Sequence, residues 1–185
     1  MDELTDDELI RMYREGHPHA FDTLFDRYYA SVYAFARAML NGSPGADDVL
    51  QETFLAVART ARDYTPRGRF RAWIMRIARN LCLNRLRRET RRRSASLGAP
   101  LVPEPVSSVP EPPEQAEADE YMRALRRAVI RLPERQREAI ALYAFEGMSY
   151  RQIAETLEAP LGTVKTLIHR ARAELTRRME SYEEP

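Results

Sequence analysis

Apolar residues recur at intervals of three and four along most of the chain, which is the spacing of one face of an α-helix. The first helix is expected to begin after Thr5, because Thr5 and Glu8 have the spacing of a capping box, and to end near Glu15. Pro18 then opens a longer helix with a wide apolar stripe, which we expect to lie in a core. That stripe consists of Phe21, Leu24, Phe25, Tyr28, Tyr29, Val32, Tyr33 and Phe35.

Two further helices are expected before the middle of the chain. Residues 41–45, with the sequence NGSPG, interrupt the helical pattern. A third helix is then predicted over residues 46–61, followed by a loop over residues 62–69. The pattern predicts a fourth helix from Phe70 to about Arg93.

A proline-rich segment separates these helices from the rest of the chain. Residues 94–115 lack helical periodicity and contain six prolines together with serine and glutamate. Such a composition is typical of an extended linker. The sequence therefore predicts an all-α protein of two small helical domains, residues 1–95 and 116–185, joined by an extended acidic linker over residues 96–115.

Helical periodicity returns after the linker. One helix is expected from about Glu114 to Leu132, with Tyr121 among the residues that face inward. Pro133 can occupy the first turn of the next helix, because a proline there removes no intrahelical hydrogen bond. That second helix is expected to end near Gly147.

The segment from Ser149 to Arg172 has the pattern of a helix-turn-helix, a motif whose second helix enters the major groove of DNA. Ser149 can cap a short helix, Pro160 interrupts it, and a second helix restarts near Gly162. This second helix has one apolar face, while its other faces carry small polar and cationic residues. An ordinary helical hairpin with a solvated charged surface has the same periodicity and is the alternative.

The net charge of +1 conceals a segregation of charge along the chain. Residues 59–93 carry 13 arginines and two acidic residues, whereas residues 94–122 carry six acidic residues and neither arginine nor lysine. Arginines interleaved with aromatic residues suit single-stranded or melting DNA, because guanidinium groups neutralise phosphates and aromatic rings stack on unpaired bases. A basic helix that faces water or an acidic partner is the alternative.

Few residues suit catalysis or metal binding. Cys82 is the single cysteine and lies among apolar residues, which predicts a buried structural thiol and fits a reducing cytoplasm. Metal-ligand spacings, a nucleophile elbow and a phosphate-binding glycine loop are absent from the sequence, so we expect no catalytic residue, metal or cofactor. We also expect no signal peptide and no membrane insertion, because no apolar run approaches the roughly 20 residues of a membrane span.

Three stretches together resemble the extracytoplasmic-function (ECF) sigma factors, the small two-domain members of the sigma-70 family. The first is DDVLQETFL at residues 47–55, and the second is FRAWI at residues 70–74, continued by IARNL and LRR. The third is LPERQRE at residues 132–138, followed by GMSY and GTVK. The resemblance implies an alternative sigma factor, which binds core RNA polymerase, recognises the −35 and −10 promoter elements and melts the DNA.

This resemblance also implies partners and contact residues. The partners would be core RNA polymerase (its β′ clamp helices and β flap), promoter DNA and an anti-sigma factor, all in the cytoplasm. The residues expected to bind core polymerase are Asp47, Asp48, Gln51, Glu52, Phe54 and Leu55. Those expected at the −10 element are Asp63, Tyr64, Arg67, Arg71, Trp73, Arg76, Asn80, Asn84, Arg87 and Arg88. Those expected at the −35 element are Arg151, Thr163, Lys165, Thr166, His169, Arg170 and Arg172.

Two other functions are alternatives to this one. An autonomous helix-turn-helix regulator that never binds polymerase would explain the tail, but it assigns no role to the acidic third helix, the basic segment or the linker. A nuclease that uses the acidic residues would need metal-ligand spacings, and the sequence has none. The family pattern also often has glycine where this chain has Glu158, which predicts a turn inside the helix-turn-helix that is either strained or slightly different.

Overall fold

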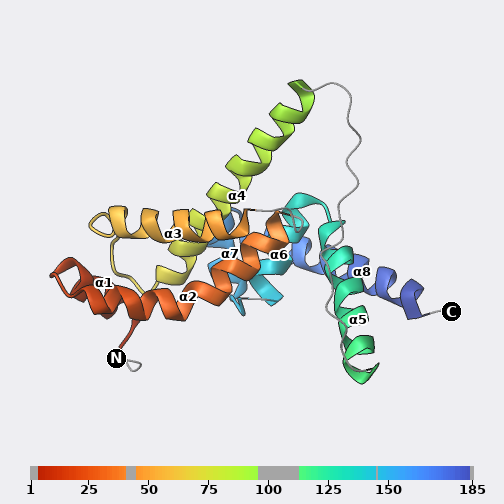
Figure 1. Cartoon of the computed structure of the whole chain (residues 1–185), viewed down its shortest axis with the longest axis horizontal. Helices are drawn as coiled ribbons and strands as arrows, with labels where there is room; N and C mark the ends of the chain where they lie inside the picture. Colours follow the sequence, from red (N-terminus) through yellow and green to blue (C-terminus); the bar gives the residue numbers. More distant parts are fainter. Residues whose placement is uncertain (1–3, 41–44, 96–112, 145, 184–185) are drawn as a thin grey trace.

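The computed structural model describes residues 4–40, 45–95, 113–144 and 146–183, and within these ranges every regular element is an α-helix (Figure 1). The first half of the chain contributes α1 (Asp6–Arg14), α2 (Pro18–Met39), α3 (Ala46–Thr60) and α4 (Phe70–Ala95). The tail half contributes α5 (Pro113–Ile130), α6 (Glu134–Ala144), α7 (Tyr150–Leu157) and α8 (Leu161–Glu183). The all-α fold is thereby confirmed.

Local capping signals begin the helices where the sequence predicts. The amide of Glu8 donates to the Thr5 hydroxyl at 3.3 Å, and the Glu8 carboxylate accepts from the Thr5 amide at 2.7 Å. Ser149 and Gln152 form the same reciprocal pair at the start of α7, which also satisfies two amides that the helix leaves unpaired. Pro18 occupies the first turn of α2.

The segment before α6 was expected to contain the end of a linker and one helix. The expected linker over residues 96–115 lies mostly outside the described residues, and α5 already begins at Pro113. The inward position predicted for Tyr121 is wrong, because its side chain is 41% exposed. Among the α5 side chains that the structure describes, Ala124, Ala128 and Val129 are buried, and the first two pack with Met179 of α8.

Aromatic side chains of α2 form the centre of the first half. Phe21 and Phe25 both contact Phe54 of α3, with ring centroids 6.1 and 4.6 Å apart. Tyr28 contacts Phe70 at the start of α4, with 5.4 Å between the ring centroids. Most of the apolar stripe predicted for residues 18–39 therefore lies in or against a core, as expected from its helical spacing. The core position predicted for Tyr29 is wrong, because its side chain is 43% exposed.

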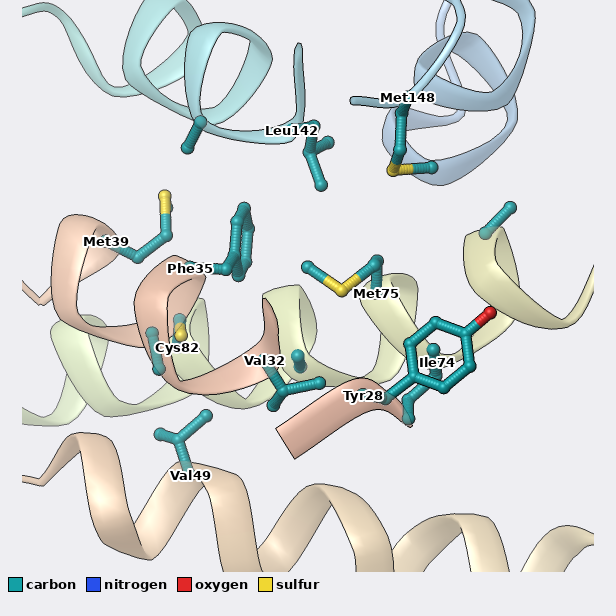
Figure 2. Packing of buried hydrophobic residues seen from close by; sticks show 14 of the residues in the cluster. Tyr28, Val32, Phe35, Met39, Val49, Ile74, Met75, Cys82, Leu142 and Met148 are labelled. Carbon is teal, nitrogen blue, oxygen red and sulfur yellow. The ribbon is translucent and has the colours of Figure 1, made fainter. Parts of the chain in front are cut away.

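This core continues without a break into the tail half. Leu142 of α6 and Met148, which follows α6, face Phe35 of α2 and Met75 of α4, and all four side chains are buried (Figure 2). Helix α7 packs on α4, and α6 packs on α2. The two halves are therefore packed on each other, while the C-terminal part of α4 projects away from the body (Figure 1).

The turn between α7 and α8 is strained at one residue. Glu158 closes α7 in the left-handed conformation, with φ 49° and ψ 48°. For a residue other than glycine this conformation costs about 1 kcal/mol, because the Cβ atom approaches the neighbouring carbonyl oxygen. The strain expected from the replacement of glycine by Glu158 is present, and the turn nevertheless forms.

Candidate functional site

The outward face of α8 presents the residues predicted to read DNA. Thr163, Lys165, Thr166, His169 and Arg170 are all exposed, whereas Val164, Ile168 and Ala171 are buried against the rest of the tail half. The exposed face combines hydroxyl, imidazole and cationic groups, which donate and accept hydrogen bonds at base edges and phosphates. In the helix-turn-helix geometry, this face is the one that a major groove would receive.

The two arginines predicted to support this face differ in their surroundings. Arg151 on α7 is exposed. The guanidinium of Arg172 lies 4.5 Å from the centroid of the Tyr143 ring, so it forms a cation–π contact between α8 and α6. Arg172 therefore helps to hold α8 on α6 in addition to any contact with DNA.

An open cavity of about 320 Å³ lies beside the start of α4. The loop before α4 and the first turns of α4 supply most of its walls, and Glu155 of α7 completes them. Its lining residues are Asp63, Tyr64, Thr65, Arg69, Ala72, Trp73, Arg76 and Glu155. Four of the residues predicted for the −10 element, namely Asp63, Tyr64, Trp73 and Arg76, are thus brought to one place.

Tyr64 has a structural role that the sequence did not indicate. Its hydroxyl donates to the Asp7 carboxylate at 2.7 Å, and the other oxygen of that carboxylate accepts from the Gly68 amide at 2.6 Å. Its ring lies 4.7 Å from that of Trp73 between centroids, and Arg14 donates to its carbonyl at 3.2 Å. Burial and the nearby Asp7 carboxylate raise the pKa of Tyr64. Helix α1 therefore holds the loop that shapes the cavity.

We expect Tyr64→Phe to destabilise the fold by about 1–2 kcal/mol, because Asp7 loses the donor on one of its oxygens. Tyr13→Phe is the matched control, since the Tyr13 ring packs on Phe21 and is kept by the change. Urea denaturation of both variants measures the difference. Equal stabilities of the two variants would show that the Tyr64 hydroxyl does not anchor the loop.

The arginines of α4 are divided between the solvent and the tail half. Arg71 donates to the carbonyl of Glu146 at 2.7 Å, and Arg76 lies 3.4 Å from the Glu158 carboxylate. The remaining predicted residues of the basic segment are exposed: Arg67, Asn80, Asn84, Arg87 and Arg88. The structure thus brings Arg71 and Arg76 together with the tail half and leaves the others in solvent.

The predicted polymerase-binding residues lie on the outer face of α3 with one exception. Asp47, Asp48, Gln51, Glu52 and Leu55 are exposed, and 47% of the Leu55 surface is accessible. The side chain of Phe54 is only 5% exposed and packs on Phe21 and Phe25, so it supports this face from inside. Asp48 also accepts from Arg85 of α4 at 2.9 Å.

The ion pairs that α4 forms with other helices were not predicted from the sequence. In the sequence, Arg79 and Arg85 are two of the 13 arginines of residues 59–93, and Glu138 is the last residue of the LPERQRE motif. Arg79 in fact makes a two-pronged contact with Glu138 at 3.0 and 3.3 Å, and Arg85 pairs with Asp48. The partners are 59 and 37 residues apart, so no local spacing could have indicated either pair.

Glu146 is a buried carboxyl at the contact between the halves. Burial raises its pKa above the ordinary value, although the Ser31 hydroxyl and the Arg71 charge act in the opposite direction. The folded chain therefore binds a proton at Glu146 more tightly than the unfolded chain does. Stability from this group is highest below the ordinary pKa of about 4.3 and decreases as the pH rises through the raised value.

From this shift we expect Glu146→Gln to increase the free energy of unfolding at pH 7, because the amide removes the need to bury a charge. The gain should be smaller at pH 4, where the native side chain is already largely protonated. Urea denaturation at both pH values measures the difference, and Glu180→Gln on the exposed side of α8 is the control. A change in the free energy of unfolding that is the same at both pH values would show that burial of the Glu146 charge is not its cause.

The described residues hold no arrangement suited to metal chemistry. Within them, no group of three or more His, Cys, Asp or Glu side chains could hold a metal ion. Burial raises the pKa of the Cys82 thiol to about 12, so this buried cysteine is protonated at neutral pH. None of the described helices combines the length and the apolar character that crossing a membrane requires.

Comparison with known proteins places both halves in one family. Residues 24–92 match the model for Sigma-70 region 2, and residues 122–175 match the model for Sigma-70, region 4. The chain is 37% identical over 175 residues to ECF RNA polymerase sigma factor SigM of Mycobacterium tuberculosis, an alignment that covers 95% of this chain and 85% of the relative. It is 38% identical over 160 residues to ECF RNA polymerase sigma factor SigE of Mycolicibacterium smegmatis, covering 84% of this chain and 60% of that longer relative.

A solved structure shows the same fold. It is that of the sigma factor RpoE in complex with the anti-sigma factor NepR from Bartonella quintana. The TM-score is 0.69 at 23% sequence identity, and the match covers 86% of this chain and 96% of the other. This likeness is one of fold.

Proposed function

Because the chain belongs to the ECF sigma factors of the sigma-70 family, we propose that it binds core RNA polymerase and directs promoter-specific initiation of transcription. In this proposal the chain recognises the −35 and −10 elements of the promoter and melts the DNA. It acts in the cytoplasm and without covalent chemistry of its own. The extent of the domains, residues 1–95 and 116–185 with a linker over 96–115, is part of the proposal.

One observation carries this proposal: the chain presents three separate surfaces suited to three different tasks. The outward face of α8 has the composition and geometry of a recognition helix. The basic α4 borders a cavity beside Trp73, which is suited to phosphates and an unstacked base. The exposed side of α3 is acidic with an apolar margin at Leu55. An autonomous DNA-binding regulator would need only the first.

The residue roles follow from these positions. We assign −35 recognition to Thr163, Lys165, Thr166, His169 and Arg170, and phosphate contacts to Arg151 and Arg172. The −10 element would contact α4 and the cavity, where Asp63 is exposed and Trp73 is partly exposed. Core polymerase would contact the outer face of α3 through Asp47, Gln51, Glu52 and Leu55.

An anti-sigma factor is the further partner that we propose. The solved neighbour described above was crystallised with such a protein, and the exposed apolar and charged surfaces of this chain offer a partner more than one place to bind. Its binding would be expected to prevent the contact with core polymerase or with DNA.

Run-off transcription tests the proposal as a whole. A pool of genomic fragments is transcribed by bacterial core polymerase with and without the chain. New discrete start sites that depend on the chain, preceded by shared −35 and −10 sequences, are the expected result. Absence of new starts, combined with binding of duplex DNA by the chain alone, would support the autonomous regulator instead.

A further inference from the structure

The first turn of α1 holds both ends of the loop before α4. The two oxygens of the Asp7 carboxylate accept from different parts of that loop, one from the Tyr64 hydroxyl at 2.7 Å and the other from the Gly68 amide at 2.6 Å. Near the end of α1, Arg14 donates to the Tyr64 carbonyl at 3.2 Å. These three hydrogen bonds join residues at least 50 positions apart in the sequence, and we call them the loop anchor.

The loop anchor gives this loop a defined shape. Because one carboxylate binds both Tyr64 and Gly68, the chain between these two residues turns back instead of extending. Gly68 has a φ of 67°, in the left-handed region, which glycine adopts without the steric cost of a Cβ atom. Hydrogen bonds to a charged group contribute more than bonds between neutral groups. The shape of the loop therefore depends strongly on Asp7.

Helix α1 is itself held firmly on the first half of the chain. Its side chains Leu9 and Ile10 are fully buried in the core. The Asp6 carboxylate accepts from Arg27 of α2 at 2.5 Å and also from the Tyr28 hydroxyl. The next residue, Asp7, is therefore presented to the loop from a fixed support.

The loop anchor also determines what faces the cavity beside α4. The Tyr64 ring lies 4.7 Å from that of Trp73 and 5.7 Å from that of Phe70 between centroids, so the anchored loop rests on the start of α4. Asp63 and Thr65, the neighbours of Tyr64 in the chain, are exposed and line the cavity. Carboxylate and hydroxyl groups form hydrogen bonds with base edges. A displacement of Tyr64 would move both of these groups.

We propose that Asp7 is a positioning residue for −10 recognition: through the loop anchor it sets where Asp63 and Thr65 meet an unstacked base, and thereby how sharply the chain discriminates between −10 sequences. This inference rests on the proposed function, because it takes the cavity as the place where the −10 element binds. Asp7 and Arg14 precede residue 24, where the match to Sigma-70 region 2 begins, so that match assigns them no role. Helix α1 thus acts on promoter recognition through the loop.

Trp73 reports the position of the loop without polymerase or DNA. It is the single tryptophan of the chain, and the Tyr64 ring packs on it at the cavity. Asp7→Ala removes both carboxylate acceptors of the loop anchor, so Tyr64 should move away from Trp73. The fluorescence emission of Trp73 should then shift to longer wavelength, and acrylamide should quench it more strongly. Glu15→Ala removes the same charge from the exposed C-terminal end of α1 and should leave the emission unchanged.

Holoenzyme formed with each variant is then compared on promoters found by the run-off assay. The ratio of transcription from an intact and a scrambled −10 element should fall about fivefold in Asp7→Ala, because two hydrogen bonds that hold the loop are lost. The corresponding ratio for the −35 element should stay close to native, since α8 is unchanged. A loss of stability alone would lower transcription from every template by the same factor and leave both ratios as they are.

Two milder substitutions separate the hydrogen bonds from other effects of the change. In Asp7→Asn the amide oxygen can accept from Gly68 and the amide N–H can donate to the Tyr64 oxygen, so the anchor can form without the charge. This variant should keep most of the native −10 ratio and Trp73 emission. Tyr64→Phe keeps the ring and loses one hydrogen bond. Its −10 ratio should fall less than that of Asp7→Ala, and it serves as the test if Asp7→Ala does not fold.

A shifted Trp73 emission in Asp7→Ala, together with a selective loss of −10 discrimination that is smaller in Asp7→Asn, supports the inference. Unchanged emission would overturn it, because the loop would keep its place without the anchor. An unchanged −10 ratio, an equal loss at both promoter elements, or a loss as large in Asp7→Asn as in Asp7→Ala would overturn it as well. Each of these results arises while start sites still depend on the chain. Absence of such starts in the native run-off assay defeats the proposed function itself, and this inference with it.

Discussion

Replacing Glu52 by arginine and Leu55 by aspartate is expected to weaken the binding of this chain to core RNA polymerase about 100-fold or more. Both side chains are exposed on the outer face of α3, one turn apart, where the acidic residues meet an apolar margin. The first change reverses a charge at the contact, and the second places a charge against an apolar partner surface. Each change costs affinity because an interface tolerates neither like charges nor an unpaired buried carboxylate.

The choice of residues follows from the structure. Asp48 belongs to the same predicted face, but it already pairs with Arg85 of α4, so reversing its charge would also disturb the contact between α3 and α4. Phe54 is buried, and its replacement would open the core. Glu52 and Leu55 can be changed with less risk to the fold.

Size-exclusion chromatography or fluorescence anisotropy with core polymerase measures this effect. Glu15→Arg is the control, since Glu15 is exposed at the C-terminal end of α1, where a positive side chain is compatible with the helix dipole. The control should bind polymerase like the native chain. If the α3 variant folds normally and binds polymerase with unchanged affinity, the face of α3 is not the polymerase-binding surface.

Replacing Lys165 and Arg170 by alanine is expected to reduce discrimination for the −35 element about 10- to 100-fold. Both residues are exposed on the outward face of α8, and a bidentate contact from such a side chain to guanine contributes about 1–3 kcal/mol of discrimination. Discrimination for the −10 element should remain close to native, because neither residue lines the cavity at the start of α4.

Holoenzyme containing the variant would be tested on promoters with either element scrambled. Arg126→Ala removes an exposed arginine from α5 of the same half and is the control for a general loss of positive charge. Its effect should be similar on every template. Equal losses at the two elements in the Lys165 and Arg170 variant would contradict the assignment of α8 as the recognition helix.

Predicted and observed structure agree best for features that depend on residues close together in the sequence. The capping box of Thr5 and Glu8 depends on residues three positions apart and was predicted from their spacing. Ser149 was predicted as a cap, whereas its reciprocal pairing with Gln152 was not. The exposed and buried faces of α8 follow from helical periodicity in the same way. Val129 and Leu132 are buried as periodicity predicts, whereas Tyr121 on the same predicted stripe is exposed. Ala124 and Ala128 pack with Met179 of α8, a contact that the local pattern does not specify.

The residues of the candidate site were partly predictable for the same reason. Exposure of Asp47, Glu52 and Leu55 follows from their common face on α3. The burial of Phe54 does not, because it depends on Phe21 and Phe25 of another helix. Tyr64 was identified from its loop, but its bond to Asp7 joins residues 57 positions apart and was not visible in the sequence.

By itself, the sequence determined the helices, their caps, the segregation of charge and the family, because each depends on neighbouring residues or on motifs in a fixed order. Only the tertiary structure decided that the tail half lies on α4, that Glu138 pairs with Arg79, and that Glu155 borders the cavity. These contacts depend on how two distant surfaces match in shape and charge. A one-dimensional pattern specifies which side chains a helix presents, whereas the packing of the halves determines which side chains meet.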